Sequence, residues 1–441
     1  MQKLKEFFTG HKKKEMLDDL LHTDSAKSVI ASIICILGGV LVGFVVLFLI
    51  ALLTPNIPFS DAFRGLFIIL GGPFASGSGN VMMILGDMIL ESVPLIMTGL
   101  SVALAFKTGL FNIGAPGQYL MGAMTSLVIA LSIDTTSFPA FLVWILAFVG
   151  GVVVGALWGA IPGLFKAFLN VNEVIVCIMT NWIAANIVSW VFKANQQFVN
   201  VAETKMNFVK PTSKNGVMTW RMGLDKIFTG SNIDFSIFLV ILIAVGMYIF
   251  INKTTLGYEL KACGYNKHAA KYAGMNEKRN IILSMMIAGA LAAAGAAFWY
   301  LNGKNDFRWD TYQSLPDNGF NGIPVALLAS NNPIGVIFSA ILLRYIGKGG
   351  FNLAGFTSFN EYVSNLIIAM IIYFSCFSKF IRDLMDKRRK ARLEKASLAA
   401  ASTIGAHGSG LLPEDSDSAE DVPNDSSEEE NEETDLGGEE K

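Results

Sequence analysis

The stretch FKTGLFNIGAPGQYLMGA, residues 106–123, decides how this chain is built. It lies between two apolar segments, yet it carries Lys107, Asn112, Pro116 and Gln118 together with four glycines. A continuous lipid-facing helix would not contain this mixture, because irregular polar backbone at membrane depth is tolerated only where protein buries it or where it lines a cavity. The stretch therefore predicts a broken helix on a solute path. The alternative is a short cytoplasmic turn followed by a glycine-rich site of helix packing.

The composition indicates a multi-pass membrane protein. Of the 441 residues, 52% are hydrophobic and 16% are charged. Runs such as Val29–Leu53 and Phe141–Gly159 match the roughly 20 apolar residues that a helix needs to cross a bilayer. The first run is too long for the core of a signal peptide and lacks a small-residue cleavage site, which favours a retained span.

The charges are segregated along the chain, although the formal net charge is only −2. Lysine and arginine are concentrated in residues 1–28 and again after the last apolar run. The positive-inside rule therefore predicts that both termini are cytoplasmic. The chain then changes to runs such as DSDSAED and SSEEENEETD, which cannot bury enough apolar surface to fold. We expect a basic cytoplasmic segment 1–28, a transmembrane domain 29–381 and a basic, then acidic, disordered tail 382–441.

The apolar pattern predicts an all-α fold with about ten transmembrane helices. The expected spans are 29–53, 87–106, 113–132, 139–165, 173–192, 235–252, 280–301, 320–331, 334–346 and 361–381. The apolar segment 62–72 is too short to cross and is expected to be interfacial or re-entrant.

The eighth and ninth spans decide the number of crossings. Asn331, Asn332 and Pro333 interrupt the apolar run, and Pro333 suits the first position of a new helix, where its missing N–H costs nothing. If 320–346 were one kinked span, the total would be nine and the C-terminus would lie outside. The basic residues after the last span favour two separate helices.

Metal, disulfide and nucleotide sites are not indicated. Four cysteines and four histidines are scattered along the chain, without a CxxC pair. The phosphate-binding pattern G-x-x-x-x-G-K-[ST] is missing, and the sequences at 347–349 and 303–305 have the wrong spacing for it. A process driven by a nucleotide would therefore take its energy from a partner.

Five polar residues in or near the spans are candidates for a solute path: Glu91, Asn112, Gln118, Asn181 and Asn186. Ionisable groups within a membrane span are costly and usually face a cavity. Glu91 is expected near the outer end of its span, where snorkelling or helix capping is an equal alternative. Hydrogen bonding between neighbouring helices is the alternative for Asn181 and Asn186.

The segment GYELKACGYNKHAAKYAGMN, residues 257–276, predicts a short helix with defined ends. Asn266 suits the N-cap position, and Gly274 suits a left-handed C-cap. Ala269, Ala270 and Ala273 would give this helix a low-profile face that fits a groove of another protein. A basic loop that lies on anionic lipid is the alternative.

These segments together resemble the permease subunits of ABC importers of the ribose and branched-chain amino acid class, especially their nucleoside and simple-sugar branch. Similar stretches follow in the family's order at 91–118, 172–184, 257–276 and 320–335, and they cover most of residues 60–380. Pro116 stands where a glutamate is more usual in the family. The acidic tail lies outside the shared region.

The resemblance implies a transport subunit and not an enzyme, in the cell membrane of a prokaryote. No cofactor is implied on this chain, and ATP and Mg would bind a cytoplasmic ABC ATPase. A second permease subunit, an extracytoplasmic substrate-binding lipoprotein and membrane lipid would be its other partners, with no role for nucleic acid. The resemblance assigns ATPase coupling to Gly264, Asn266, Ala269, Ala270, Tyr272, Ala273 and Gly274.

A nucleoside is the solute that the resemblance favours. A ribose-like simple sugar, riboflavin or a branched-chain amino acid are the alternatives within the same class. The rival from another class is an ion-coupled secondary transporter, in which acidic or histidine relays within the membrane are common. Apart from Glu91, the predicted spans contain almost none of these residues.

Overall fold

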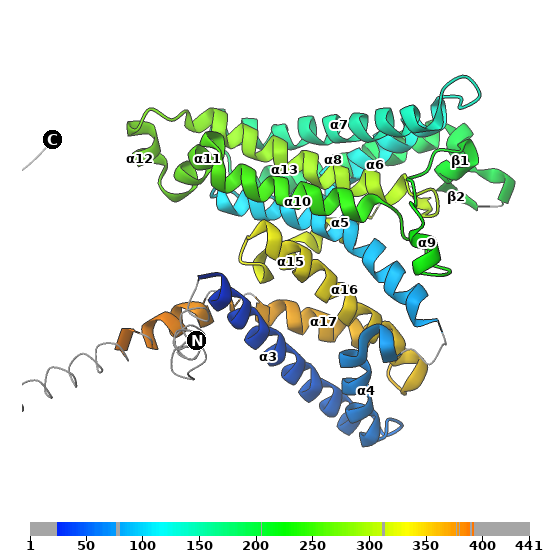
Figure 1. Ribbon diagram of the computed structural model, residues 1–441, viewed down its shortest axis with the longest axis vertical. Coiled ribbons are helices and arrows are strands. Elements are labelled where there is room, and N and C mark those ends of the chain that lie inside the picture. Colours follow the sequence, from blue (N-terminus) through cyan, green and yellow to red (C-terminus); the bar gives the residue numbers. More distant parts are fainter. Residues whose placement is uncertain are drawn as a thin grey trace, which may run out of the picture. The chain divides into compact units, whose positions relative to one another are not determined.

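The computed structural model describes residues 24–391, apart from 76–79, 204, 311–313, 376, 379 and 389. Residues 1–23 of the basic N-terminal segment and residues 392–441 of the acidic tail lie outside this part, so the expectations for them stay predictions. The chain divides into two units, Met1–Met385 and Asp386–Lys441. Every site discussed below lies in the first unit, whose long helices are shown in Figure 1.

Among the described residues, seven helices are long and apolar enough to cross a membrane. They are α3 (Asp24–Leu53), α5 (Val81–Lys107), α7 (Ala140–Leu169), α8 (Glu173–Ala194), α10 (Ser236–Lys253), α13 (Glu277–Tyr300) and α16 (Pro333–Phe356). Two further helices, α6 (Ala115–Ser132) and α17 (Glu361–Ser375), coincide with predicted spans. They do not meet this standard of length and hydropathy. The all-α membrane fold is confirmed, and the count of ten crossings stays a prediction.

Shorter elements fill the connections between these helices. They are α4 (Phe59–Gly71), α9 (Leu224–Ile227), α11 (Thr255–Tyr265), α12 (Lys267–Tyr272), α14 (Asp317–Phe320) and α15 (Gly322–Leu328), with 3-10 turns η1 (Gly72–Ala75), η2 (Gln196–Phe198), η3 (Val201–Glu203) and η4 (Thr212–Asn215). The segment expected to be interfacial or re-entrant corresponds to α4.

The break between the eighth and ninth predicted spans is present in the structure. Residues 320–331 hold only the end of α14 and the short α15, after which Ser330 and Asn331 take φ values of 49° and 58°. Pro333 begins α16, and the Asn332 side chain caps it by accepting a hydrogen bond from the N–H of Ile334 at 3.0 Å. The sequence therefore identified this helix start correctly.

The helix that holds the ninth predicted span is longer than that span. The span was expected to end at Ile346, but the glycine-rich residues 347–356 continue α16 to Phe356. Their glycines serve close packing: a Cβ atom at Gly349 would lie 2.5 Å from the carbonyl oxygen of Ile69 in α4. Because only glycine allows the two helices to approach this closely, a sequence typical of a loop forms a helix here.

Small residues also bring α7 and α13 together. A Cβ atom at Gly155 would lie 2.1 Å from Cβ of Ala293, and one at Gly289 would lie 2.3 Å from the carbonyl oxygen of Gly155. Within membranes, where lipid removes most of the hydrophobic drive between helices, such close contacts are a main source of helix association. Of the seven long apolar helices in the described part of the chain, α5 and α13 are the most deeply buried, whereas most of α7 faces outward.

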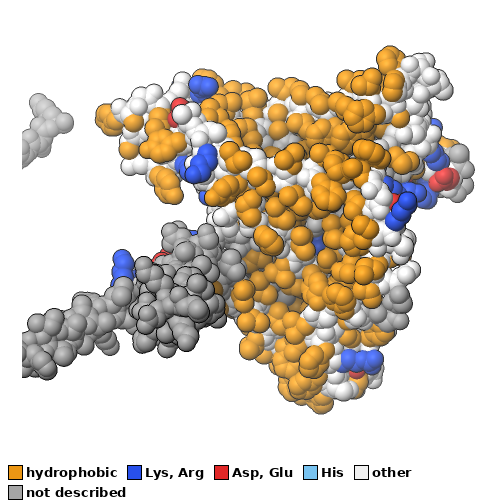
Figure 2. All heavy atoms as spheres, viewed as in Figure 1, with side chains coloured by type: hydrophobic (Ala, Val, Ile, Leu, Met, Phe, Trp, Pro, Cys, Tyr) orange, Lys and Arg blue, Asp and Glu red, His pale blue; other side chains and the backbone are white. Residues whose placement is uncertain are grey.

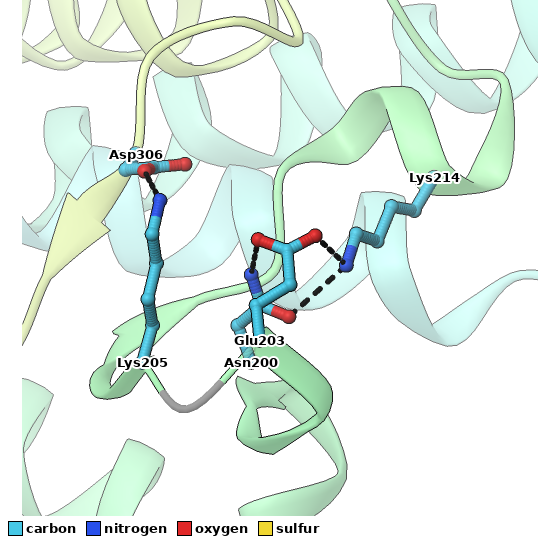
Figure 3. Close-up of polar contacts among 5 residues, drawn as sticks. All are labelled: Asn200, Glu203, Lys205, Lys214 and Asp306. Carbon is cyan, nitrogen blue, oxygen red and sulfur yellow. Dashed lines mark hydrogen bonds and ion pairs between the residues drawn. The ribbon is translucent and has the colours of Figure 1, made fainter.

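A small antiparallel sheet lies at one end of the molecule, where only loops were expected. It joins β1 (Val199–Asn200), β2 (Lys205–Val209) and β3 (Phe307–Arg308) in that order. Lys205 pairs with Asp306 at 3.0 Å, and Lys214 pairs with Glu203 at 2.7 Å (Figure 3). The hydrogen bond from Lys214 lowers the pKa of Glu203, and the hydrogen bond to Asp306 raises the pKa of Lys205. Both pairs are solvent-exposed, so they fix the geometry of the sheet more than they stabilise it.

The two ends of the helix bundle are chemically distinct from its flank. Helices α11 and α12 lie at one end, opposite the sheet and α9 (Figure 1). Hydrophobic side chains cover most of the flank between these ends, whereas lysine and arginine are concentrated towards the ends (Figure 2). This distribution is expected of a protein whose flank faces lipid and whose ends face water.

The structure generates a test of orientation. If the α11–α12 end lies in the cytoplasm, we expect Met206→Cys on β2 to react with an impermeant maleimide in intact cells. Tyr272→Cys on α12 should react only after the cells are opened. Both positions are exposed, at 66% and 94%. Cys35, Cys177 and Cys263 are buried, and Cys376 is replaced by serine to lower the background. Labelling of Tyr272→Cys in intact cells would reverse the predicted topology.

Candidate functional site

The connection between α5 and α6, residues 108–114 and here called the elbow, is the polar break that the sequence predicted. Asn112 and Gln118 form a reciprocal amide pair: Nδ2 of Asn112 donates to Oε1 of Gln118 at 2.8 Å, and Nε2 of Gln118 donates to Oδ1 of Asn112 at 3.0 Å. Asn112 also donates to Oγ of Ser101 at 3.0 Å. Both amides are buried, so their mutual hydrogen bonds replace those that water would supply.

Asn181 ties α8 to the same break. Its Oδ1 accepts a hydrogen bond from the N–H of Gly117 at 2.9 Å, and its Nδ2 donates to the carbonyl oxygen of Ile113 at 2.9 Å. One side chain thus satisfies two backbone groups that the interrupted helix leaves unpaired. Asn112, Gln118 and Asn181 lie together and use these hydrogen bonds to brace the elbow.

The other two predicted residues lie elsewhere. Asn186 is exposed on α8 and donates to the carbonyl oxygen of Trp182 at 2.8 Å, one turn earlier on the same helix. Glu91 on α5 accepts from Nζ of Lys348 on α16 at 2.6 Å. Lys348 belongs to the glycine-rich stretch that was expected to be a loop, so the partner of Glu91 was not identified from the sequence.

The sequence reasoning missed a polar group around Arg344, in the middle of α16. Nη2 of Arg344 donates to Oδ1 of Asn318 at 2.6 Å. The backbone oxygen of Asn318 accepts from Oγ1 of Thr98 at 2.9 Å, and its Nδ2 lies 3.5 Å from the hydroxyl of Tyr119. The signal was available, because an arginine within the apolar run GVIFSAILLRYIG is an ionisable residue inside a predicted span.

Residues 264–274, here called the docking segment, have the local structure that the sequence predicted. Oδ1 of Asn266 accepts from the N–H of Ala269 at 3.1 Å, and Gly274 takes φ of 80° after α12. The expected face of three alanines is split, because Ala270 is only 3% exposed and packs against the protein itself. Its neighbours Ala269 and Ala273 are exposed, together with Tyr272.

The docking segment begins directly on the elbow. A Cβ atom at Gly264 would lie 2.6 Å from the carbonyl carbon of Thr108 and 2.8 Å from the backbone nitrogen of Gly109. In return, a Cβ at Gly109, whose φ is 72°, would lie 2.9 Å from the carbonyl oxygen of Gly264. Backbone therefore packs on backbone, with no side chain between the docking segment and the elbow.

Metal chemistry finds no support in the part of the chain that the structure describes. No group of three or more histidine, cysteine, aspartate or glutamate side chains is placed to hold a metal ion there. The site consists instead of neutral amides at the elbow and a charged group around Arg344.

The amide pair predicts a specific loss of stability. Gln118→Leu keeps a similar side-chain size but leaves the buried amide of Asn112 without its partner, which costs about 1–3 kcal/mol. We expect a lower midpoint of thermal unfolding for the purified protein. The double variant Asn112→Leu/Gln118→Leu removes both polar groups, so its loss should be smaller than the sum of the two single losses. Additive losses would show that the pair does not act as a unit.

Comparison with known proteins agrees with this geometry. The profile of the family described as "Branched-chain amino acid transport system / permease component" matches residues 84–375. The guanosine ABC transporter permease protein NupP of Bacillus subtilis strain 168 is 36% identical over 69% of this chain and 84% of its own length. The nucleoside ABC transporter permease protein NupB of Lactococcus lactis subsp. cremoris is 35% identical over 72% of this chain and 85% of its own.

A more distant relative is the glucose ABC transporter permease protein TsgB13 of Haloferax volcanii, which is 29% identical over 68% of this chain and 77% of its own. No solved structure matches the chain. The matched residues include the elbow, the docking segment and Arg344. The chain therefore belongs to the family of branched-chain amino acid transport system permease components and is a transport subunit rather than an enzyme.

Proposed function

We propose that this protein is the permease subunit of an ATP-binding cassette importer that moves a nucleoside across the cell membrane. The similarity to a guanosine and a nucleoside permease over more than two thirds of the chain supports the solute class. The single structural observation that carries the proposal is the contact of Gly264 with the elbow, because it connects an exposed, aqueous end of the protein with the polar break between two spans.

A cytoplasmic ATPase that binds ATP and Mg is the partner proposed for the docking segment. Ala269, Tyr272 and Ala273 offer an exposed surface on a capped helical turn, and Tyr265 is 90% exposed beside them. Asn266 caps the start of the helical turn and Gly274 ends it. Ala270 holds the turn against the rest of the protein. Closure of the ATPase would push this turn, and Gly264 would transmit the push to the elbow.

A second permease subunit is the partner proposed within the membrane. The relatives of this chain include two permeases from each of two transporters, NupP with NupQ and NupB with NupC. This pairing supports a heterodimer of related permeases. An extracytoplasmic binding lipoprotein would deliver the solute at the sheet end.

The proposed solute path runs along the elbow and the charged group beside it. Asn112, Gln118 and Asn181 hold the break open as a rigid polar feature, and Glu91 with Lys348 supplies balanced charge on the neighbouring helices. Asn186, exposed on α8, would face the path only from a surface shared with another subunit. A sugar is the second candidate, which the similarity to a glucose permease favours.

Coupling is tested by Ala269→Asp. Position 269 is the third residue of α12, where a negative charge suits the helix N-terminus, so the turn itself should remain folded. The new carboxylate would be unpaired in the contact with the ATPase. It would weaken binding of the ATPase by an amount on the order of several kcal/mol. Nucleoside uptake should be lost while the permease still inserts and the isolated ATPase still hydrolyses ATP.

Ala194→Asp is the matched control, because Ala194 is an exposed alanine at the end of α8 near the sheet. It should leave co-purification of the ATPase with the permease unchanged, whereas Ala269→Asp should abolish it. Normal uptake by Ala269→Asp would exclude the docking role of α12.

The solute and the energy source are tested by uptake of labelled guanosine in cells that express all subunits. We expect unlabelled purine and pyrimidine nucleosides to compete, and ribose, riboflavin and leucine to have no effect, because Glu91 and Lys348 on the proposed path are paired with each other and do not supply a free charge for leucine. Competition by ribose or leucine alone would contradict the nucleoside assignment. Uptake that survives ATP depletion and stops with an ionophore would contradict the importer class.

A further inference from the structure

A partly open cavity of about 600 Å³ lies beside the middle of α16. Its walls come from α5, the α14–α15 region, α16 and α17. The apolar wall consists of Leu95, Pro316, Leu343 and Ala369, and the polar wall consists of Asp317, Asn318, Asn321, Arg344 and Asn365. Sites for small molecules have volumes of roughly 300–1,000 Å³ and combine apolar walls with a few polar groups. This cavity has both properties.

Arg344 has hydrogen-bonding capacity that the protein does not use. A guanidinium has five N–H donors, and Nη2 is the one nitrogen that donates to a described residue, Asn318. Nε is buried without a partner. An arginine in the middle of a spanning helix is costly to keep, and such residues mark substrate and ion pathways. Nε is closed off from the cavity, so the donors left for a ligand are Nη1 and the second hydrogen of Nη2.

The charges around this cavity balance. Lys348 lies one turn beyond Arg344, and its ammonium pairs with Glu91 at 2.6 Å. The carboxylates of Glu91 and Asp317 both act electrostatically on the Arg344 guanidinium. The charges of the two cations are thus balanced by those of the two carboxylates. A site without net charge favours a neutral ligand over an anion, which excludes a phosphorylated solute as the preferred occupant.

The guanidinium is held in one orientation by a chain of contacts. Asn318 accepts from Arg344, and its backbone is fixed to Thr98 of α5 at 2.9 Å. Its Nδ2 lies 3.5 Å from the hydroxyl of Tyr119, on the helix that follows the elbow. Asn318 is therefore a positioning residue, and it connects the cavity with α6, the helix that follows the elbow.

We propose that this cavity holds the solute within the membrane and that Arg344 recognises an edge with two adjacent hydrogen-bond acceptors, as N7 and O6 of a 6-oxopurine nucleoside provide. A guanidinium presents parallel donors that match this pair of acceptors, whereas a lysine ammonium is a single point of charge. Asp317, Asn321 and Asn365 offer partners for hydroxyl groups. The inference rests on the proposed nucleoside import. It specifies in addition the edge of the nucleoside base that the protein recognises.

The test compares uptake of guanosine and of 7-deazaguanosine, which lacks the N7 acceptor, by the complete transporter. Uptake is measured for the wild type and for Arg344→Lys. This variant keeps the positive charge but loses the parallel donors of the guanidinium. The binding protein is the same in both, so its own preference cancels when the two guanosine to 7-deazaguanosine ratios are divided. We expect the wild-type ratio to be about fivefold higher than the variant ratio, the factor for one hydrogen bond.

Arg308→Lys is the control, because Arg308 is an exposed arginine on β3 and its replacement should leave the ratio unchanged. An equal fall in the uptake of both nucleosides by Arg344→Lys would show that Arg344 is only structural and would overturn the inference. Lack of uptake of either nucleoside by the wild type would instead contradict the proposed function.

A second variant keeps the inference testable if Arg344→Lys does not assemble. Ala369→Trp fills the cavity from its apolar wall, at an exposed position on α17 where a larger side chain does not disturb the core. Uptake of both nucleosides should fall at least about tenfold while the subunits still assemble, as detected by co-purification with the ATPase. Unchanged uptake by this variant would overturn the placement of the solute in this cavity.

Discussion

The structure depends on how broken helices satisfy their backbone hydrogen bonds where water does not reach. A continuous helix pairs its own N–H and carbonyl groups, but each interruption leaves several of them without partners, and lipid supplies none. Asn181 provides this compensation at the elbow by binding Gly117 and Ile113, and the Asn112–Gln118 pair closes the remaining space. Without these amides, the polar break would be too costly to keep between two membrane spans.

Close packing of small residues makes that compensation geometrically possible. Side chains of asparagine and threonine are short, so they reach a neighbouring backbone only where the helices almost touch. Gly155 and Gly289 remove the side chains that would separate α7 from α13, and Gly264 does the same between α11 and the elbow. The same glycines let short side chains reach their partners and bring the backbone of the docking segment directly against the elbow.

The charged group around Arg344 adds a second kind of compensation. Glu91 and Lys348 pair with each other, and Asp317 offsets the guanidinium, so the region has polar character without net charge. Within a family of transport subunits, a neutral polar cavity of this kind suits a neutral solute that must be held briefly and then released. Tight binding is unnecessary in the membrane if another protein captures the solute outside.

The sequence alone determined the membrane class, the family resemblance, the polar break around Asn112, the caps at Asn266 and Gly274 and the helix start at Pro333, because hydropathy, helix caps and turns are local properties. It also singled out Asn112, Gln118 and Asn181 as polar residues in or near the spans. Tertiary structure decided what these residues contact. It turned the glycine-rich residues 347–356 into helix by packing them on α4, it buried Ala270, and it brought Arg344 to Asn318, 26 residues away. Partners so far apart along the chain meet only through packing, and no local pattern records which helices lie side by side.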